Sequence, residues 1–123
     1  MLRKFTKKKF QFSFTPHLSP MFRGILSTIY VDLENNISQA KVLKTLTNFY
    51  KNESFVKILK PDSLLSTNEV INTNNCYISV CKSKYSNKII ILSAIDNLIK
   101  GGAGQAVQNL NNKFNFSERT GLK

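Results

Sequence analysis

The segment Ile89–Leu92 consists only of isoleucine and leucine, which restricts the possible fold more than any other stretch of this chain. A strand that is apolar on both faces belongs in the interior of a sheet. The preceding segment Tyr77–Lys82 also has strand character, and the five residues Ser83–Asn87 between the two suit a hairpin loop. The sequence therefore predicts an antiparallel hairpin of strands 77–82 and 88–94, with its second strand interior.

Three more strands and two irregular passages are predicted upstream. In Phe10–Thr15 the phenylalanines alternate with polar residues, which indicates a half-buried strand that Pro16 ends. Ile25–Leu33 is largely apolar on both faces at its start, so a central strand is expected. Phe55–Leu59 is a short strand. Thr15–Gly24, with two prolines and a glycine, is a shaped loop, and Ser63–Asn75 is polar and irregular.

Two helices complete the pattern. Ser38 is placed to cap the first, and one of its faces is expected to be core: Val42, Leu43, Leu46, Phe49 and Tyr50. The second, at about 98–114, carries apolar residues at helical spacing: Ala103, Ala106, Val107, Leu110 and Phe114. A loose tail, Asn115–Lys123, follows. We expect one α+β domain, with a mixed, mainly antiparallel sheet packed against two or more helices.

The formal charge of +11 favours nucleic-acid binding in principle, but the kind of charge argues against it. There are 15 lysines and only 3 arginines, together with 14 asparagines, as A/T-rich coding DNA produces. The one basic cluster, Arg3–Lys9, lies at the terminus. A small RNA- or DNA-binding module and a structural dimerisation module remain the alternatives. No apolar run is long enough for a membrane helix and no secretory signal is recognisable, so we expect a soluble, intracellular protein.

Few residues suit catalysis or metal binding. His17 has no acidic neighbour in sequence, so a loop-bonding role is favoured over that of a general base. Cys76 and Cys81 are expected to be reduced packing residues, and no metal site is predicted, because the only histidine is far from both.

The pair Asp96–Asn97 directly follows the apolar strand, and it either stabilises a turn or contacts a ligand. Gly101, Gly102 and Gly104 come next. These glycines match neither the dinucleotide fingerprint nor a P-loop. A structural role, in which they let the start of a helix pack closely against a neighbour, is the alternative to ligand binding.

Three strings are similar to one known family. They are F-T-P-H-L-S-P-M-F-R-G-I-L-S-T-I-Y (Phe14–Tyr30), T-N-E-V-I-N-T-N-N-C (Thr67–Cys76) and S-A-I-D-N-L-I-K-G-G-A-G-Q-A-V-Q-N-L-N (Ser93–Asn111). In this order they resemble the C-terminal portion of the N-acetyl-gamma-glutamyl-phosphate reductases, which are related to aspartate-semialdehyde dehydrogenase and have a glyceraldehyde-3-phosphate dehydrogenase-like C-terminal domain. The resemblance extends from about Phe12 to Leu122.

The resemblance implies an NADP(H)-dependent oxidoreductase of arginine biosynthesis that interconverts N-acetyl-gamma-glutamyl phosphate and N-acetyl-glutamate 5-semialdehyde. Residues 1–123 would form its substrate and dimerisation domain. The family's Rossmann domain, cysteine segment S-N-P-G-C-Y and histidine motif H-R-H-x-P-E are absent, so no catalytic residue is assigned and the chain alone is expected to be inactive. Cofactor contacts are implied for Asn97, Gly101, Gly102 and Gln105.

The same resemblance implies a dimer or tetramer that associates through the sheet, no nucleic-acid or membrane partner, and a cytoplasmic or organelle-stroma location. Three positions depart from the family pattern. Gly102 replaces a frequent alanine, Asn68 replaces a lysine and Asn72 replaces a glycine. Asparagine is tolerated at a glycine position only where left-handed backbone geometry suffices.

Overall fold

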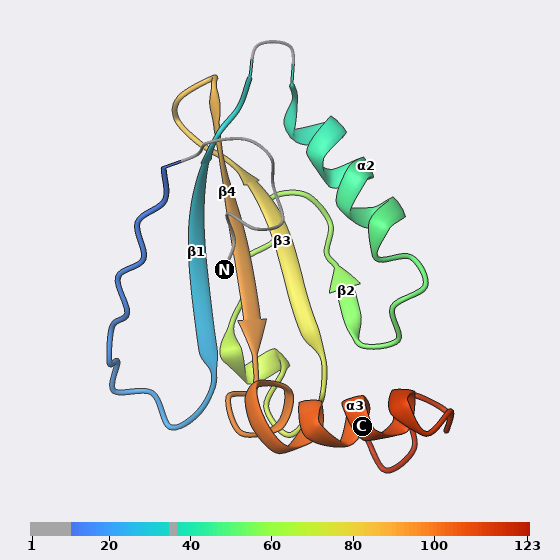
Figure 1. Cartoon of the computed structure of the whole chain (residues 1–123). Coiled ribbons are helices and arrows are strands. Elements are labelled where there is room, and N and C mark those ends of the chain that lie inside the picture. Colours follow the sequence, from blue (N-terminus) through green and yellow to red (C-terminus); the bar gives the residue numbers. More distant parts are fainter. Residues whose placement is uncertain (1–10, 35–36) are drawn as a thin grey trace.

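The computed structural model describes residues 11–34 and 37–123. Its centre is a four-stranded sheet in the order β1-β4-β3-β2, made of β1 (Ile25–Asp32), β4 (Lys88–Ile95), β3 (Cys76–Lys82) and β2 (Val56–Ile58). β4 is antiparallel to both neighbours, and β2 is parallel to β3. The helix α2 (Gln39–Phe49) lies over β2 and β3, and α3 (Gly104–Lys113) crosses the ends of the strands (Figure 1). This arrangement confirms the predicted α+β class.

The predicted hairpin is confirmed. β3 and β4 pair from Cys76 opposite Ile95 to Lys82 opposite Ile89, and the five residues between the strands form the connecting loop. β4 is interior, as its sequence indicated, because β1 pairs along its other edge. Ile89 and Ala94 of this strand are buried.

The prediction that Ile25–Leu33 forms a central strand is wrong, because β1 lies at one edge of the sheet. Its side chains are largely exposed on both faces, with Ile29 at 46% and Tyr30 at 72%. Apolar residues on both faces indicated burial, but within the described part of the chain only β4 pairs with this strand.

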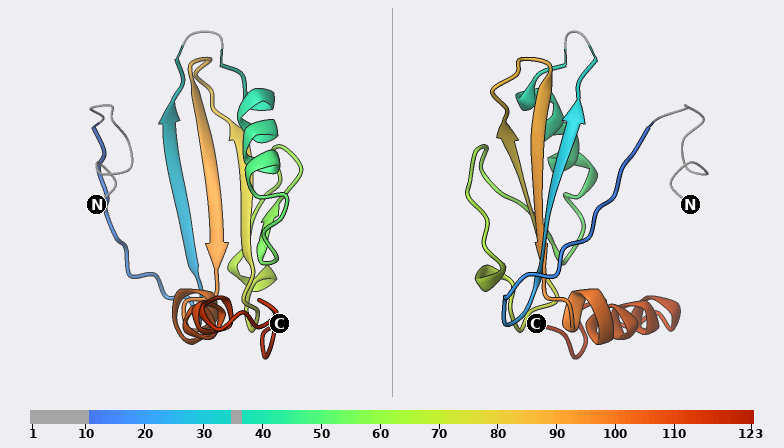
Figure 2. Two further views of the ribbon diagram at one scale, coloured as in Figure 1. Left: turned by 45° about the vertical axis from the view of Figure 1, so that its right-hand side comes forward. Right: turned by 90° about the vertical axis from the view of Figure 1, so that its left-hand side faces the viewer.

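The predicted half-buried strand Phe10–Thr15 is also wrong for residues 11–15, and Phe10 lies outside the described residues. Residues 11–19 form no helix or strand, and the side chains of Phe12 and Phe14 are exposed. The segment runs along the outside of β1 and stands away from the sheet (Figure 2). The alternation of phenylalanines with polar residues was therefore not enough to pair this segment with the sheet.

The helix α2 begins where the sequence placed it. The Ser38 hydroxyl accepts a hydrogen bond from the backbone N–H of Lys41 at 3.2 Å, which is the expected N-cap. The predicted core face is only half-buried, and the correction is largest for Phe49, whose side chain is 74% exposed. Since α2 packs mainly on β2 and β3, one short strand and one long one, it has too little sheet beneath it to be buried.

The other face of the sheet is covered by the passage between β2 and β3. Leu65 and Val70 from this passage pack with Ala94 of β4, and these three residues form the buried cluster. As predicted, the passage is mostly irregular, but it contains the 3-10 turn η1 (Thr67–Glu69), whose capping box joins Ser66 and Glu69. The polar composition of this passage therefore gave no indication of the ordered turn at Thr67–Glu69.

After β4 comes a π-helical turn, η2 (Ile99–Ala103), which is kinked at Gly102 and leads into α3; together they cover nearly the range 98–114 expected as one helix. The helix is inverted relative to the usual amphipathic pattern. Its buried residues are Gly104, Gln108 and Asn111, whereas its apolar residues are exposed: Val107, Leu110 and Phe114. Among the described helices, none is long and apolar enough to cross a bilayer.

The prediction of a loose tail at Asn115–Lys123 is wrong. Asn111 donates from Nδ2 to the backbone oxygens of Glu118 and Thr120, at 3.1 and 2.9 Å. The backbone N–H of Asn74 donates to the backbone oxygen of Lys123 at 2.6 Å. The tail therefore folds back along α3 and reaches the loop before β3.

We expect Gly24→Ala to lower the free energy of unfolding by about 3 kcal/mol, as measured by urea denaturation. Gly24 has a φ of +108°, and a Cβ there would lie 2.6 Å from the Cβ of Thr67. Gly121→Ala is the matched control, because Gly121 has a φ of +73° with nothing within 4 Å of its Cβ position, and it should cost only about 1 kcal/mol. Equal costs at the two positions would contradict the close approach to Thr67.

Candidate functional site

Asp96 is the centre of a corner formed where β4 ends. Its side chain is completely buried and bonded from three separate parts of the chain. Arg23 Nε, just before β1, lies 3.0 Å from Oδ1 and 2.9 Å from Oδ2. The backbone N–H of Asn72 donates to Oδ2 at 2.8 Å, and those of Leu98 and Ile99 donate to Oδ1 at 2.8 and 3.0 Å. Asp96 therefore has the turn-stabilising role, one of the two that the sequence left open.

The surroundings of Asp96 favour its ionised form. Burial opposes ionisation, but the backbone N–H groups of Asn72, Ile99 and Leu98 and the guanidinium of Arg23 together hold the pKa of Asp96 below its ordinary value. An ionised carboxylate can only accept hydrogen bonds, and the three backbone N–H groups and the Arg23 guanidinium around Asp96 are all donors. The corner is consistent with a carboxylate that stays charged in the folded protein.

Asn97 fastens the same corner to the chain before β1. Its Oδ1 accepts a hydrogen bond from the backbone N–H of Gly24 at 2.8 Å. The amide nitrogen Nδ2 has no partner among the described residues and remains free to donate. Of the two ends of this side chain, one is structural and the other is available to a ligand.

Asn72, the asparagine at a family glycine position, has a φ of +61°. This is the left-handed geometry that the substitution requires, and it is tolerable for asparagine. The backbone of Asn72 in this conformation presents its N–H to Asp96. The backbone at Asn72 therefore has the left-handed geometry for which the resemblance implied a glycine.

Gly101 and Gly102 lie exposed beside Asn97. A Cβ at Gly101 would lie 3.4 Å from the backbone oxygen of Asp96, and a Cβ at Gly102 would lie 3.4 Å from that of Asn97. Gln105, half-buried one turn later, donates from Nε2 to Asn109 at 2.9 Å. Of the four residues for which cofactor contacts were implied, Gly101 and Gly102 thus lie beside Asn97, whereas Gln105 contacts Asn109.

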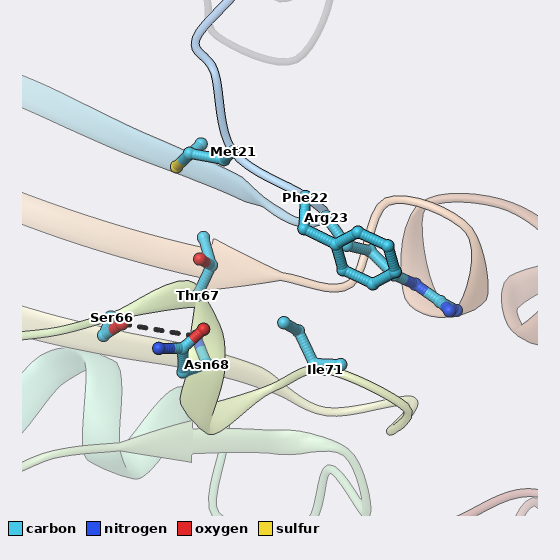
Figure 3. Close-up of a pocket in the computed structure, with 7 residues that line it drawn as sticks. All are labelled: Met21, Phe22, Arg23, Ser66, Thr67, Asn68 and Ile71. Atoms are coloured by element: carbon cyan, nitrogen blue, oxygen red, sulfur yellow. Dashed lines mark hydrogen bonds between the residues drawn. The ribbon is translucent and has the colours of Figure 1, made fainter.

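A hollow of about 350 Å³ opens on the other side of Arg23 (Figure 3). Met21, Phe22 and Arg23 line one side of it, and the η1 region lines the other with Ser66, Thr67, Asn68 and Ile71. It combines an apolar wall with a few hydroxyl and amide groups.

Among the described residues, no candidate nucleophile or base hydrogen-bonds to Asp96 or Asn97, although Cys76 pairs with Ile95 directly before the corner. His17 is exposed and has no hydrogen-bond partner within residues 11–34 and 37–123. Cys76 and Cys81 are free, half-buried thiols, and Cys76 Sγ lies 3.5 Å from the Ser93 hydroxyl. In the described part of the chain, no three acidic, cysteine or histidine residues gather as a metal site.

Sequence reasoning did not find Arg23, Gly24 or Asn72 as parts of the corner. The available signals were the Arg-Gly pair directly before an apolar strand and the asparagine at a glycine position. Neither signal gives the partner, because Arg23 and Asp96 are separated by 73 positions.

Comparison with known proteins gives a consistent result. The sequence model of the family described as "Semialdehyde dehydrogenase, dimerisation domain" matches residues 1–97. N-acetyl-gamma-glutamyl-phosphate reductase from Thermoanaerobacter pseudethanolicus is 48% identical over 121 residues, which cover 98% of this chain and 35% of the relative.

Relatives of the same name occur in other bacteria. The Halothermothrix orenii protein is 48% identical over 111 residues, covering 90% of this chain and 32% of the relative. The protein of Campylobacter jejuni subsp. doylei is 44% identical over 117 residues, which cover 95% of this chain and 34% of the relative. The chain therefore spans about a third of the length of these curated relatives.

We expect stability to fall as the pH drops below about 4, because the folded pKa of Asp96 is below its unfolded value. The contribution of the ionised form is fully present above that range and is lost as pH falls through the folded pKa. Asp96→Asn should cost about 3 kcal/mol at pH 7 and flatten this acid dependence, as measured by urea denaturation across pH.

The matched control is Asp32→Asn, which removes the ion pair of an exposed carboxylate with Lys88. It should change stability by no more than about 0.5 kcal/mol at pH 7. An Asp96→Asn variant with unchanged stability, or with the wild-type acid dependence, would show that the corner does not depend on the charged carboxylate.

Proposed function

The chain belongs to the family of semialdehyde dehydrogenase dimerisation domains, and on this premise we propose that it forms the dimerisation and cofactor-facing part of an NADP(H)-dependent reductase. The reaction proposed is the interconversion of N-acetyl-gamma-glutamyl phosphate and N-acetyl-glutamate 5-semialdehyde in arginine biosynthesis. Its support is the identity of 44 to 50% to reductases of that name. We also propose that the protein acts in the cytoplasm or an organelle stroma.

The observation that carries the proposal is the pairing of a free amide donor with two exposed glycines. Asn97 Nδ2 points from a side chain whose oxygen is already held by Gly24, so its orientation is fixed. Gly101 and Gly102 next to it have no side chains, so a flat ligand can approach the backbone closely. These features fit the carboxamide and ring of a nicotinamide.

In this proposal Asn97 donates to the cofactor, Gly101 and Gly102 form the surface on which it rests, and Gln105 borders it. When bound, the cofactor supplies hydride transfer. The residues of this chain orient that group and exclude water on one side. Because neither S-N-P-G-C-Y nor H-R-H-x-P-E occurs in this sequence, we propose that the chain alone has no turnover.

The proposed homo-oligomer would form through one face of the sheet. The strand register places Ile25 opposite Ile95 and Ile29 opposite Ile91, so these four side chains share a face, which we call the isoleucine face. Ile25 and Ile29 are 45% and 46% exposed. The two isoleucine pairs flank the pair Ser27–Ser93 on this face. Exposed apolar side chains grouped in this way are typical of a protein interface, and a second copy of the chain is the occupant we propose.

A chimera tests the proposed reaction. We expect the Thermoanaerobacter reductase, with its matching stretch replaced by this chain, to retain NADPH-dependent turnover. Asn97→Asp in the chimera should lower kcat/KM about tenfold or more, because it keeps the oxygen that binds Gly24 but removes the amide donor. Asn87→Asp, an equal change of charge in the exposed loop between β3 and β4, is the control.

A folded chimera without turnover would contradict the proposed function. Wild-type kcat/KM in the Asn97→Asp chimera would contradict the cofactor contact alone.

Ile29→Lys should weaken self-association of the chain about a hundredfold, as measured by sedimentation equilibrium, because it places a charge in the isoleucine face. Thr28→Lys is the matched control, since the neighbouring side chain points to the opposite face of the same strand. If both variants associate as the wild type does, the interface lies elsewhere.

A further inference from the structure

The buried side of α3 carries two side-chain amides, those of Gln108 and Asn111, and Gln108 makes the wider set of contacts. The residue is 7% exposed, and its side chain joins three elements. Gln108 Oε1 accepts from Lys100 Nζ at 2.7 Å and from Asn74 Nδ2 at 2.9 Å. Gln108 Nε2 donates to Glu118 Oε1 at 2.7 Å. The amide therefore links the π-helical turn, the loop before β3 and the C-terminal tail.

The chemistry of the partners fixes the orientation of this amide. A lysine ammonium can only donate, and an ionised carboxylate can only accept. Gln108 must therefore turn its oxygen to Lys100 and its nitrogen to Glu118, and Asn74 must turn its nitrogen to Gln108. The consequence appears in the structure, because Asn74 Oδ1 is buried without a hydrogen-bond partner among the described residues.

Asn74 also brings the helix very close. A Cβ at Gly104, the first residue of α3, would lie 2.4 Å from Asn74 Oδ1. Glycine is therefore required at this position for the loop and the helix to meet. The approach directly follows the π-helical turn that contains Gly101 and Gly102.

Phe55 extends the same contacts beneath the tail. Its ring is 1% exposed, with Lys100 Nζ 5.5 Å and Arg119 Cζ 5.6 Å from its centroid. These are cation–π distances. Lys100 and Arg119, one from the turn and one from the tail, are thus both held against a single buried side chain.

We propose that Gln108 is a positioning residue that, through Lys100, Asn74 and Glu118, fixes the turn Ile99–Ala103 and so sets the place of Gly101 and Gly102. This inference rests on the proposed function, which gives those glycines a ligand. Its structural part depends only on the contacts of Gln108 and can be tested without activity.

The two charged partners of Gln108, Glu118 and Lys100, influence each other's pKa. The hydroxyl of Ser54 lowers the pKa of Glu118, burial raises it, and Gln108 and Lys100 lower it further. Burial lowers the pKa of Lys100, whereas Cys76, Glu118 and Glu53 raise it. The groups that face Gln108 and its partners are therefore Lys100, Glu118, Glu53, Arg119 and the Cys76 thiol.

Gln108→Glu in the full chain is the decisive variant. It keeps the oxygen that Lys100 and Asn74 use, but it puts a carboxylate against Glu118. Two carboxylates that share a site bind a proton at a raised pKa. We expect the hydrogen-exchange protection of the Gly101 and Ala103 amides, which bond Asp96 and Leu98, to fall about tenfold at pH 7.

That protection should return as the pH falls from about 7 to about 5, when the shared proton restores the donor. In the wild type it should stay constant over this range. Asn109→Asp, which adds the same charge to the outer side of α3, should leave protection within about twofold of the wild type. Amides in the centre of β4 should be unaffected in all variants.

Unchanged protection in Gln108→Glu at pH 7, or a loss that does not return at pH 5, would overturn the assignment of Gln108. In the chimera, the same variant should lower kcat/KM at pH 7 and recover it at pH 5. An active chimera whose kcat/KM is unchanged by Gln108→Glu would overturn the positioning role. A chimera without any turnover would instead refute the proposed function, and the hydrogen-exchange result would then test the structural part by itself.

Discussion

The buried carboxylate of Asp96 is the interaction on which the rest of the molecule depends. It receives hydrogen bonds from the segment before β1, from the passage between β2 and β3, and from the start of the terminal helix. A buried charge is stable only when it is fully paired and hydrogen-bonded, so each of these segments must hold its position for the others to stay in place. The neighbouring side chain of Asn97 is held to the segment before β1, because its Oδ1 accepts a hydrogen bond from the backbone N–H of Gly24.

A second theme is the unusual distribution of polar and apolar groups. The terminal helix buries Gln108 and Asn111 and exposes its apolar residues, and β1 exposes isoleucines at the edge of the sheet. Polar contacts fasten the helix to the tail and to the loop before β3, while these apolar side chains stay exposed. This is the pattern expected of a domain that works in contact with other folded units, and it agrees with the family to which the chain belongs.

The sequence predicted those parts of the fold whose signals are local. The hairpin, the interior position of β4 and the Ser38 cap depend on neighbouring residues, and all three are confirmed. The predictions were wrong where tertiary packing determines whether a segment is buried or paired. The edge position of β1, the exposed Phe12 and the ordered tail depend on which surfaces are available for packing. The corner itself needed contacts across 73 positions, which spacing alone cannot give.

The most direct measurement is a double-mutant cycle between Arg23→Ala and Asp96→Asn, with unfolding free energies from urea denaturation at pH 7. If the carboxylate joins the segment before β1 to the terminal helix, the two substitutions should be coupled by about 2 kcal/mol, so that the double variant is less destabilised than the sum of the single ones. Effects that add to within about 0.5 kcal/mol would show that Asp96 does not hold these segments together.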